Sequence, residues 1–175
     1  RMKCHLKNKH MEVNLYDIWK EVENDVGSMA KDGAKLEIDT ELLLCYANPF
    51  MLQVWNELKK RDIPIIVVSD MYLPKSVIEE MLYKNGYTGY DKLYVSCEYG
   101  KNKASGTLFE VVKKDYPNKK IIHVGDNPHS DKVMAEKNGF ATCQYPNINK
   151  NMLLYRPFDM SYLVGSAYRA LISNK

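Results

Sequence analysis

The sequence predicts an α/β fold with a mostly parallel sheet. Short apolar runs alternate with segments of helical spacing between Ile63 and Tyr145. Strands and helices that alternate in this way form parallel strand pairs through crossover connections. Three of the apolar runs are followed by polar or charged residues, and the carboxyl ends of parallel strands share one edge of a sheet. We therefore expect these polar groups to meet at that edge.

Length and composition indicate which classes of protein this chain can belong to. The 175 residues suit one domain with its own core, and 45% hydrophobic and 27% charged residues are typical of ordered globular chains. The formal charge is only +3 and the basic residues are spread along the chain, so we predict no nucleic-acid partner. No 18-residue apolar run is present, so we predict no membrane partner.

The cysteines predict a reducing compartment. The sequence has four, widely separated and without a Cys-x-x-Cys pair: Cys4, Cys45, Cys97 and Cys143. Such cysteines are expected to be free thiols in the cytoplasm rather than disulfides or zinc ligands.

The first third of the chain is predicted to be helical. Residues 12–30 carry apolar side chains at helical spacing, and Asn48-Pro49 is a typical helix start for a second segment that reaches Arg61. The run at residues 36–44 between them is ambiguous between strand and helix.

Four strands and their connecting helices are predicted in the rest of the chain. Each strand is a short apolar run bounded by turn residues. The strands are predicted at residues 63–68, 93–96, 121–124 and 141–145, with helices at 74–85, at 107–114 and from Asp131 to Gly139. A loop at 146–157 and an amphipathic helix at 160–172 complete the chain.

The polar residues at the strand ends suggest phosphate chemistry. Ser69 and Asp70 end the first strand, Lys101 and Lys103 lie in the loop after the second, and Asp126 follows the third with Asp131 five residues later. A hydroxyl and an ammonium can hold phosphoryl oxygens, and two carboxylates can hold magnesium. Each residue also has a simpler explanation, since Ser69, Asp70 and Asp126 could cap turns or helices and the lysines could be solvated.

The order of these residues resembles the motifs of the haloacid dehalogenase superfamily, which are mostly magnesium-dependent phosphatases on a Rossmann-like fold. The matching segments are Val67-Val68-Ser69 for the second motif, Lys103 for the third, and Val124-Gly125-Asp126 through Asp131 for the fourth. We prefer Lys103 to Lys101 because Ala-Ser-Gly follows it.

Longer segments are similar to a bacterial branch of this superfamily that is often joined to glycosyltransferases of surface-polysaccharide synthesis. These segments are Ser69-Asp70-Met71-Tyr72-Leu73-Pro74, Lys103-Ala104-Ser105-Gly106, His123-Val124-Gly125-Asp126-Asn127 and Ser130-Asp131. The resemblance covers about residues 36 to 147.

The resemblance implies a three-layer sandwich around the parallel sheet, with a small helical cap portion at the N-terminus. It divides the chain into cap portion and connecting helix at 1–61, core at 62–147 and a C-terminal loop and helix at 148–175. It implies a small phosphate ester such as a sugar phosphate as substrate, and a fused or associated glycosyltransferase domain as partner. Ser69 and Lys103 would be catalytic, Asp70 would join them in binding phosphate, and Asp126 and Asp131 would bind magnesium.

One motif of the superfamily is missing. Its first motif, an apolar strand ending in Asp-x-Asp, supplies the nucleophile and should precede Ser69. The only candidate is the ambiguous run, in which Glu37 and Asp39 would replace the two aspartates. Residues 36–48 look more like the helix that returns from the cap.

We therefore expect the nucleophile strand to lie upstream of Arg1 and this chain to be inactive. In the superfamily that strand is central, between the strands that end at Ser69 and before Asp126. Its loss would leave two inner edges unpaired and a groove in the core.

Two rival functions stay open. A non-catalytic module could keep this fold in order to contact a glycosyltransferase. Carbon–halogen cleavage occurs on the same fold, but that branch needs no magnesium, so the Asp126 and Asp131 pair argues against it.

Overall fold

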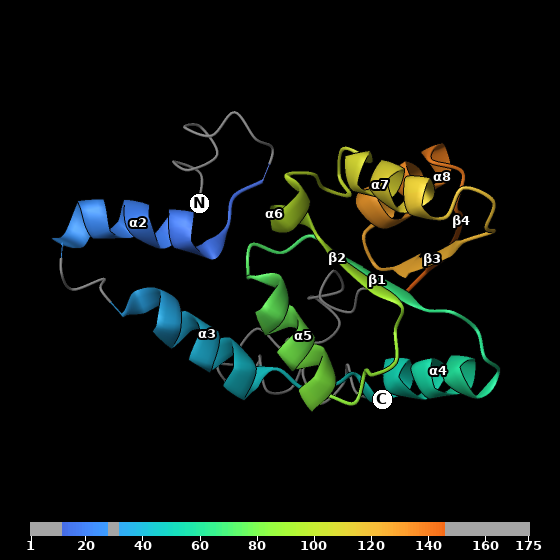
Figure 1. The fold of residues 1–175 in the computed structure, drawn as a ribbon, viewed down its shortest axis with the longest axis horizontal. Helices are drawn as coiled ribbons and strands as arrows, with labels where there is room; N and C mark the ends of the chain where they lie inside the picture. The colour runs from blue at the N-terminus through green and yellow to red at the C-terminus, as the bar shows by residue number, and fades with distance from the viewer. Residues whose placement is uncertain (1–11, 28–31, 146–175) are drawn as a thin grey trace, which may run out of the picture.

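The strands form two separate parallel pairs. The computed structural model describes residues 12–27 and 32–145. Strand β1 (Ile66–Ser69) pairs in parallel with β2 (Lys92–Val95), and β3 (Ile122–Gly125) pairs in parallel with β4 (Ala141–Gln144) (Figure 1). The α/β class and the parallel pairing are confirmed. The described strands make two sheets of two strands each.

Three helices precede β1. They are α2 (Leu15–Val26), α3 (Gly33–Leu44) and α4 (Pro49–Lys60). The amide of Met51 donates to Oδ1 of Asn48 at 3.1 Å, so Asn48 caps α4 in the way its sequence predicts. The ambiguous run at residues 36–44 is helical throughout, and no strand precedes β1 among the described residues.

The later helices, apart from the one at Ser96–Tyr99, lie close to their predicted places. They are α5 (Lys75–Lys84), α6 (Ser96–Tyr99), α7 (Thr107–Asp115), the π-helical segment η2 (Pro128–Val133) and α8 (Met134–Lys137). The prediction of strand at Ser96 is wrong, since this residue starts α6. The loop predicted at 146–157 and the helix predicted at 160–172 lie outside the described residues, as does Cys4.

One core cluster joins the N-terminal helices to the first sheet. Leu15 of α2, Leu73 and the α5 residues pack with Leu93 and Val95 of β2. Side chains alternate between the two faces of a strand, so Leu93 and Val95 face α5 while Tyr94 between them faces the opposite side. Helices α5 and α7 accordingly lie on opposite sides of the β1–β2 pair (Figure 1).

Helix α7 connects the two sheets. Its residues Phe109 and Val112 are fully buried and share a cluster with Tyr94 of β2 and Phe140, which precedes β4. The Phe109 ring meets the Phe140 ring edge-on at a centroid distance of 5.4 Å and the His123 ring of β3 at 5.0 Å. The two strand pairs are thus held together by one helix on a shared face.

In the part of the chain that the structure describes, β1 and β3 each have one edge without a partner strand. Each has a paired neighbour on one side only among the described residues. On β3, Ile122 and Val124 are 68% and 43% exposed, a large exposure for apolar side chains in a parallel strand.

The cysteines and the lengths of the helices bear on two further predictions. Cys45, Cys97 and Cys143 are free thiols, as predicted. Across the described helices, none has both the length and the apolar character needed to cross a bilayer.

Candidate functional site

Charged groups that follow three different strands meet at one place. Nζ of Lys103 lies 2.6 Å from Oδ1 of Asp131, and the amide of Lys103 donates to Oδ1 and Oδ2 of Asp70 at 2.9 and 3.2 Å. Asp70 follows β1, Lys103 lies in the loop after β2 and α6, and Asp131 lies in η2 after β3. We call these three residues the strand-end cluster. Of the groups predicted to meet at one edge of the sheet, Lys103 and Asp131 are in direct contact, and Asp70 holds the backbone of Lys103.

Asp131 is the most buried member of the strand-end cluster. Its side chain is only 5% exposed, and its Oδ1 accepts from Lys103 and lies 3.0 Å from Nε2 of His123. Its Oδ2 accepts from the amide of Asn127 at 3.0 Å. Both carboxylate oxygens therefore have partners, as a buried carboxylate requires.

Gly125 makes room for this carboxylate. A Cβ atom at Gly125 would lie 2.4 Å from Cγ and 2.5 Å from Cβ of Asp131, distances that real Cβ contacts do not show. The glycine before Asp126 thus has a steric role, because it lets the Asp131 side chain approach the end of β3.

The local environment sets the charge of both aspartates. Burial alone would raise the pKa of the Asp131 carboxyl, but hydrogen bonds from His123, Lys103 and the Asn127 amide outweigh burial and hold this pKa well below its ordinary value. Burial raises the pKa of Asp70, and the hydrogen bond from the Lys103 amide offsets only part of that rise. Asp131 is therefore the stable anionic partner of Lys103.

Acid is expected to weaken the fold through Asp131. Its native pKa lies below that of an unfolded aspartate, about 3.9, so its contribution to stability is complete above about pH 5 and is lost as the pH falls further. Asp70, with its raised pKa, acts in the opposite sense. Urea unfolding of the wild type between about pH 6 and pH 3 should show a steeper loss of stability than Asp131→Asn. Equal slopes of stability against pH for the two proteins would contradict the lowered pKa of Asp131.

The other two predicted site residues lie at strand ends. Ser69 is the last residue of β1, pairs in register with Val95 and is half-buried. Asp126 directly follows Gly125 at the end of β3 and is also half-buried. Ser69 adjoins the strand-end cluster through Asp70, the next residue in the chain.

Asp131, which the sequence predicts to bind magnesium together with Asp126, has protein partners. The oxygens of Asp131 accept from Lys103 and the Asn127 amide, so this carboxylate holds an ammonium where a metal ligand was expected. Over residues 12–27 and 32–145, no group of three or more His, Cys, Asp and Glu side chains could hold a metal ion.

The two substitutes considered for a nucleophile have other roles. Glu37 accepts from Nε1 of Trp19 at 2.6 Å and from the Tyr72 hydroxyl at 2.7 Å. Asp39 forms an exposed pair with Lys35 at 3.3 Å. Both lie on α3, so the interpretation of this run as a strand carrying the nucleophile is wrong, and the helix interpretation is confirmed.

Sequence reasoning missed three polar residues that build the site. His123 contacts Asp131, Asn127 caps η2, and Asn102 orders the Lys103 loop. Strand alternation was the available signal for His123, because it shares a face of β3 with Gly125.

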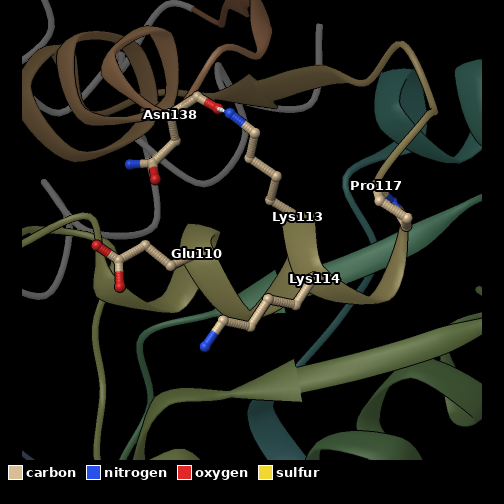
Figure 2. Close-up of a pocket in the computed structure, with 5 residues that line it drawn as sticks. All are labelled: Glu110, Lys113, Lys114, Pro117 and Asn138. Atoms are coloured by element: carbon tan, nitrogen blue, oxygen red, sulfur yellow. Dashed lines mark hydrogen bonds between the residues drawn. The ribbon is translucent and has the colours of Figure 1, made fainter.

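A surface pocket lies away from this site, on the outer side of α7. Glu110, Lys113, Lys114, Pro117 and Asn138 line it (Figure 2). Lys113 points toward Asn138 and donates to its carbonyl at 2.9 Å (Figure 2). None of the strand-end cluster lines this pocket, so it offers no link to the predicted chemistry.

Comparison with known proteins leaves the family open. No protein-family model matches the chain. No curated protein sequence matches it significantly.

Proposed function

We propose that this chain is a haloacid dehalogenase-like hydrolase domain that acts, with magnesium, on a small phosphate ester such as a sugar phosphate. The observation that carries the proposal is the strand-end cluster, in which a buried aspartate holds one specific lysine at the carboxyl ends of parallel strands. Open α/β sheets bind their ligands at this edge.

The site residues would divide the work of phosphoryl transfer. The Ser69 hydroxyl would donate to a phosphoryl oxygen, and the Lys103 ammonium would balance the negative charge. Asp131 would fix Lys103 in place, and Asp70 would hold the backbone of the same residue. Asp126 would hold magnesium, which would supply further positive charge next to the phosphoryl oxygens.

The nucleophile would come from a strand that lies outside the described residues. We place it between β1 and β3, since each of these strands has one edge without a described partner and runs parallel to its described neighbour. An apolar strand in that position would lie beside Ile122 and Val124, and its carboxyl end would meet the strand-end cluster. An aspartate at that end would then face Lys103.

Magnesium-dependent release of phosphate from an aryl phosphate tests the proposal. We expect no release by the 175-residue chain. We expect release by a longer native chain whose upstream codons add an Asp-x-Asp strand, and Lys103→Ala should lower that activity by about 100-fold or more.

The neighbouring lysine provides the matched control, since Lys101→Ala should leave the rate close to that of the parent. Activity of the 175-residue chain would overturn the missing-nucleophile proposal. An inactive longer chain that contains the Asp-x-Asp strand would overturn the hydrolase proposal.

A non-catalytic module associated with a glycosyltransferase is the second candidate. The observation that favours it is the absence, among the described residues, of any strand before β1 that could carry a nucleophile. Upstream codons that lack an Asp-x-Asp strand would select this candidate.

A further inference from the structure

Glu12, just before α2, reaches the loop that carries Lys103. Its Oε1 accepts from Nδ2 of Asn102 at 2.9 Å, and its Oε2 accepts from the Ser96 hydroxyl at 2.9 Å. The contact with Asn102 joins residues 90 positions apart in the chain. One carboxylate therefore links the start of the helical N-terminal part to the loop between α6 and α7.

Asn102 organises that loop. Its Oδ1 accepts from the Ser105 amide at 2.8 Å, and its backbone carbonyl accepts from the Leu108 amide at 3.1 Å. The next residue, Lys103, donates its amide to Asp70. The side-chain nitrogen of Asn102 thus donates to Glu12, and its side-chain oxygen accepts from the loop. Glu12 therefore fixes the orientation of the side-chain amide that holds the loop.

The backbone beneath Glu12 is firmly anchored. Val13 and Leu15 are 1% and 0% exposed, and the Leu15 amide donates to the Tyr72 carbonyl at 2.8 Å. A side chain on an anchored backbone can define a position for its partner, whereas one on a mobile segment cannot.

We infer that Glu12 is a positioning residue for Lys103, which it places through Asn102, and that it couples the start of α2 to the strand-end cluster. The inference rests on the proposed function only for the role of Lys103 toward phosphate. The placement of the lysine loop by Glu12 is a property of the chain without substrate.

The substitution Glu12→Gln should preserve this role. The side-chain oxygen of the introduced glutamine can accept from Asn102, and its amide nitrogen can donate to the Ser96 oxygen. The Ser96 hydroxyl can then donate to the Met71 carbonyl, which already lies 3.3 Å away. Alanine can do none of this, so Glu12→Ala and Glu12→Gln separate loss of the acceptor from loss of the charge.

Hydrogen exchange of assigned amides, followed by NMR without phosphate, is the first test. Glu12→Ala should speed exchange of the Lys103 amide by about tenfold, the loss expected for one hydrogen bond to a charged group, and should move its proton resonance. Exchange at Val112, buried in α7, should stay unchanged. Glu12→Gln should resemble the wild type, and Asn102→Ala should have the same effect on Lys103 as Glu12→Ala together with Asn102→Ala.

Ser96→Ala is the matched control, because it removes the other contact of Glu12 and leaves Asn102 bound. It should not change the Lys103 signal. Unchanged Lys103 exchange in Glu12→Ala, equal acceleration at Lys103 and Val112, or a glutamine variant as impaired as the alanine variant would each overturn the inference.

Titration with inorganic phosphate, followed at the Lys103 amide, is the second test. The wild type should bind phosphate, and Glu12→Ala should raise the Kd for phosphate by about tenfold. If the wild type does not bind phosphate while Glu12→Ala still releases the Lys103 loop, the proposed function fails and the positioning inference holds. If the wild type binds phosphate and Glu12→Ala changes neither the Lys103 exchange nor the phosphate Kd, the positioning inference fails and the binding still supports the proposed function.

Discussion

Asp131→Ala is expected to lower the free energy of unfolding by about 3–5 kcal/mol, the loss that follows when one member of a buried ion pair is removed. Lys103 and Asp131 have side chains only 15% and 5% exposed, so the ammonium would be left largely buried without its counter-ion. His123 and the Asn127 amide would lose an acceptor as well. Urea unfolding at neutral pH measures the change.

Asp39→Ala is the matched control for this variant. It also removes an aspartate that is paired with a lysine, but the Lys35 and Asp39 side chains are 80% and 57% exposed. An exposed pair of this kind contributes less than about 0.5 kcal/mol. Equal losses for Asp131→Ala and Asp39→Ala would show that the burial of Asp131 has no energetic importance.

Gly125→Ala is expected to lower the free energy of unfolding by about 3 kcal/mol, the upper end of the usual range for overpacking. The new methyl group would occupy the space of the Asp131 side chain, whose Cγ would be 2.4 Å away. Displacement of Asp131 should also remove the acid-dependent loss of stability that distinguishes the wild type from Asp131→Asn. Urea unfolding at neutral and acid pH tests both effects.

Gly27→Ala provides the contrast. Nothing lies within 4 Å of a Cβ atom at Gly27, but its φ of 69° and ψ of −150° are a conformation that essentially only glycine adopts, so the expected loss is the backbone strain of about 1–3 kcal/mol. The acid dependence should persist in this variant. A Gly125→Ala protein that keeps the wild-type acid dependence would show that Asp131 has not moved.

Local sequence signals were enough to predict those elements whose ends carry a capping residue or a proline. Asn48-Pro49 marks the start of α4 because an asparagine cap and a proline in the first turn act without help from the rest of the chain. The start of β1 was predicted at Ile63 but lies at Ile66, since pairing with β2 begins only there, opposite Lys92. Helix α6 was missed because four residues are too few to show a helical period.

The placement of the site residues at successive strand ends was predictable from the sequence, but the contacts between them were not. Strand ends placed Asp70, Lys103 and Asp131 at one edge, because that placement depends only on topology. A carboxylate can hold a metal ion or an ammonium equally well on chemical grounds, and only the folded geometry gives Asp131 to Lys103. Glu37 was ambiguous for a similar reason, since its helix is selected by packing against Trp19 and Tyr72 from distant parts of the chain.

The division into two strand pairs has a consequence for the order of folding. Each pair is made from a continuous stretch of chain, β1–α5–β2 in one case and β3–η2–α8–β4 in the other. Contacts between residues close in sequence form early, so each unit can fold before it meets its neighbour. Lys103 follows the first unit, in the loop before α7, whereas Asp131 lies in the second unit. Assembly of the site is therefore a late event, completed when α7 docks the two units against each other.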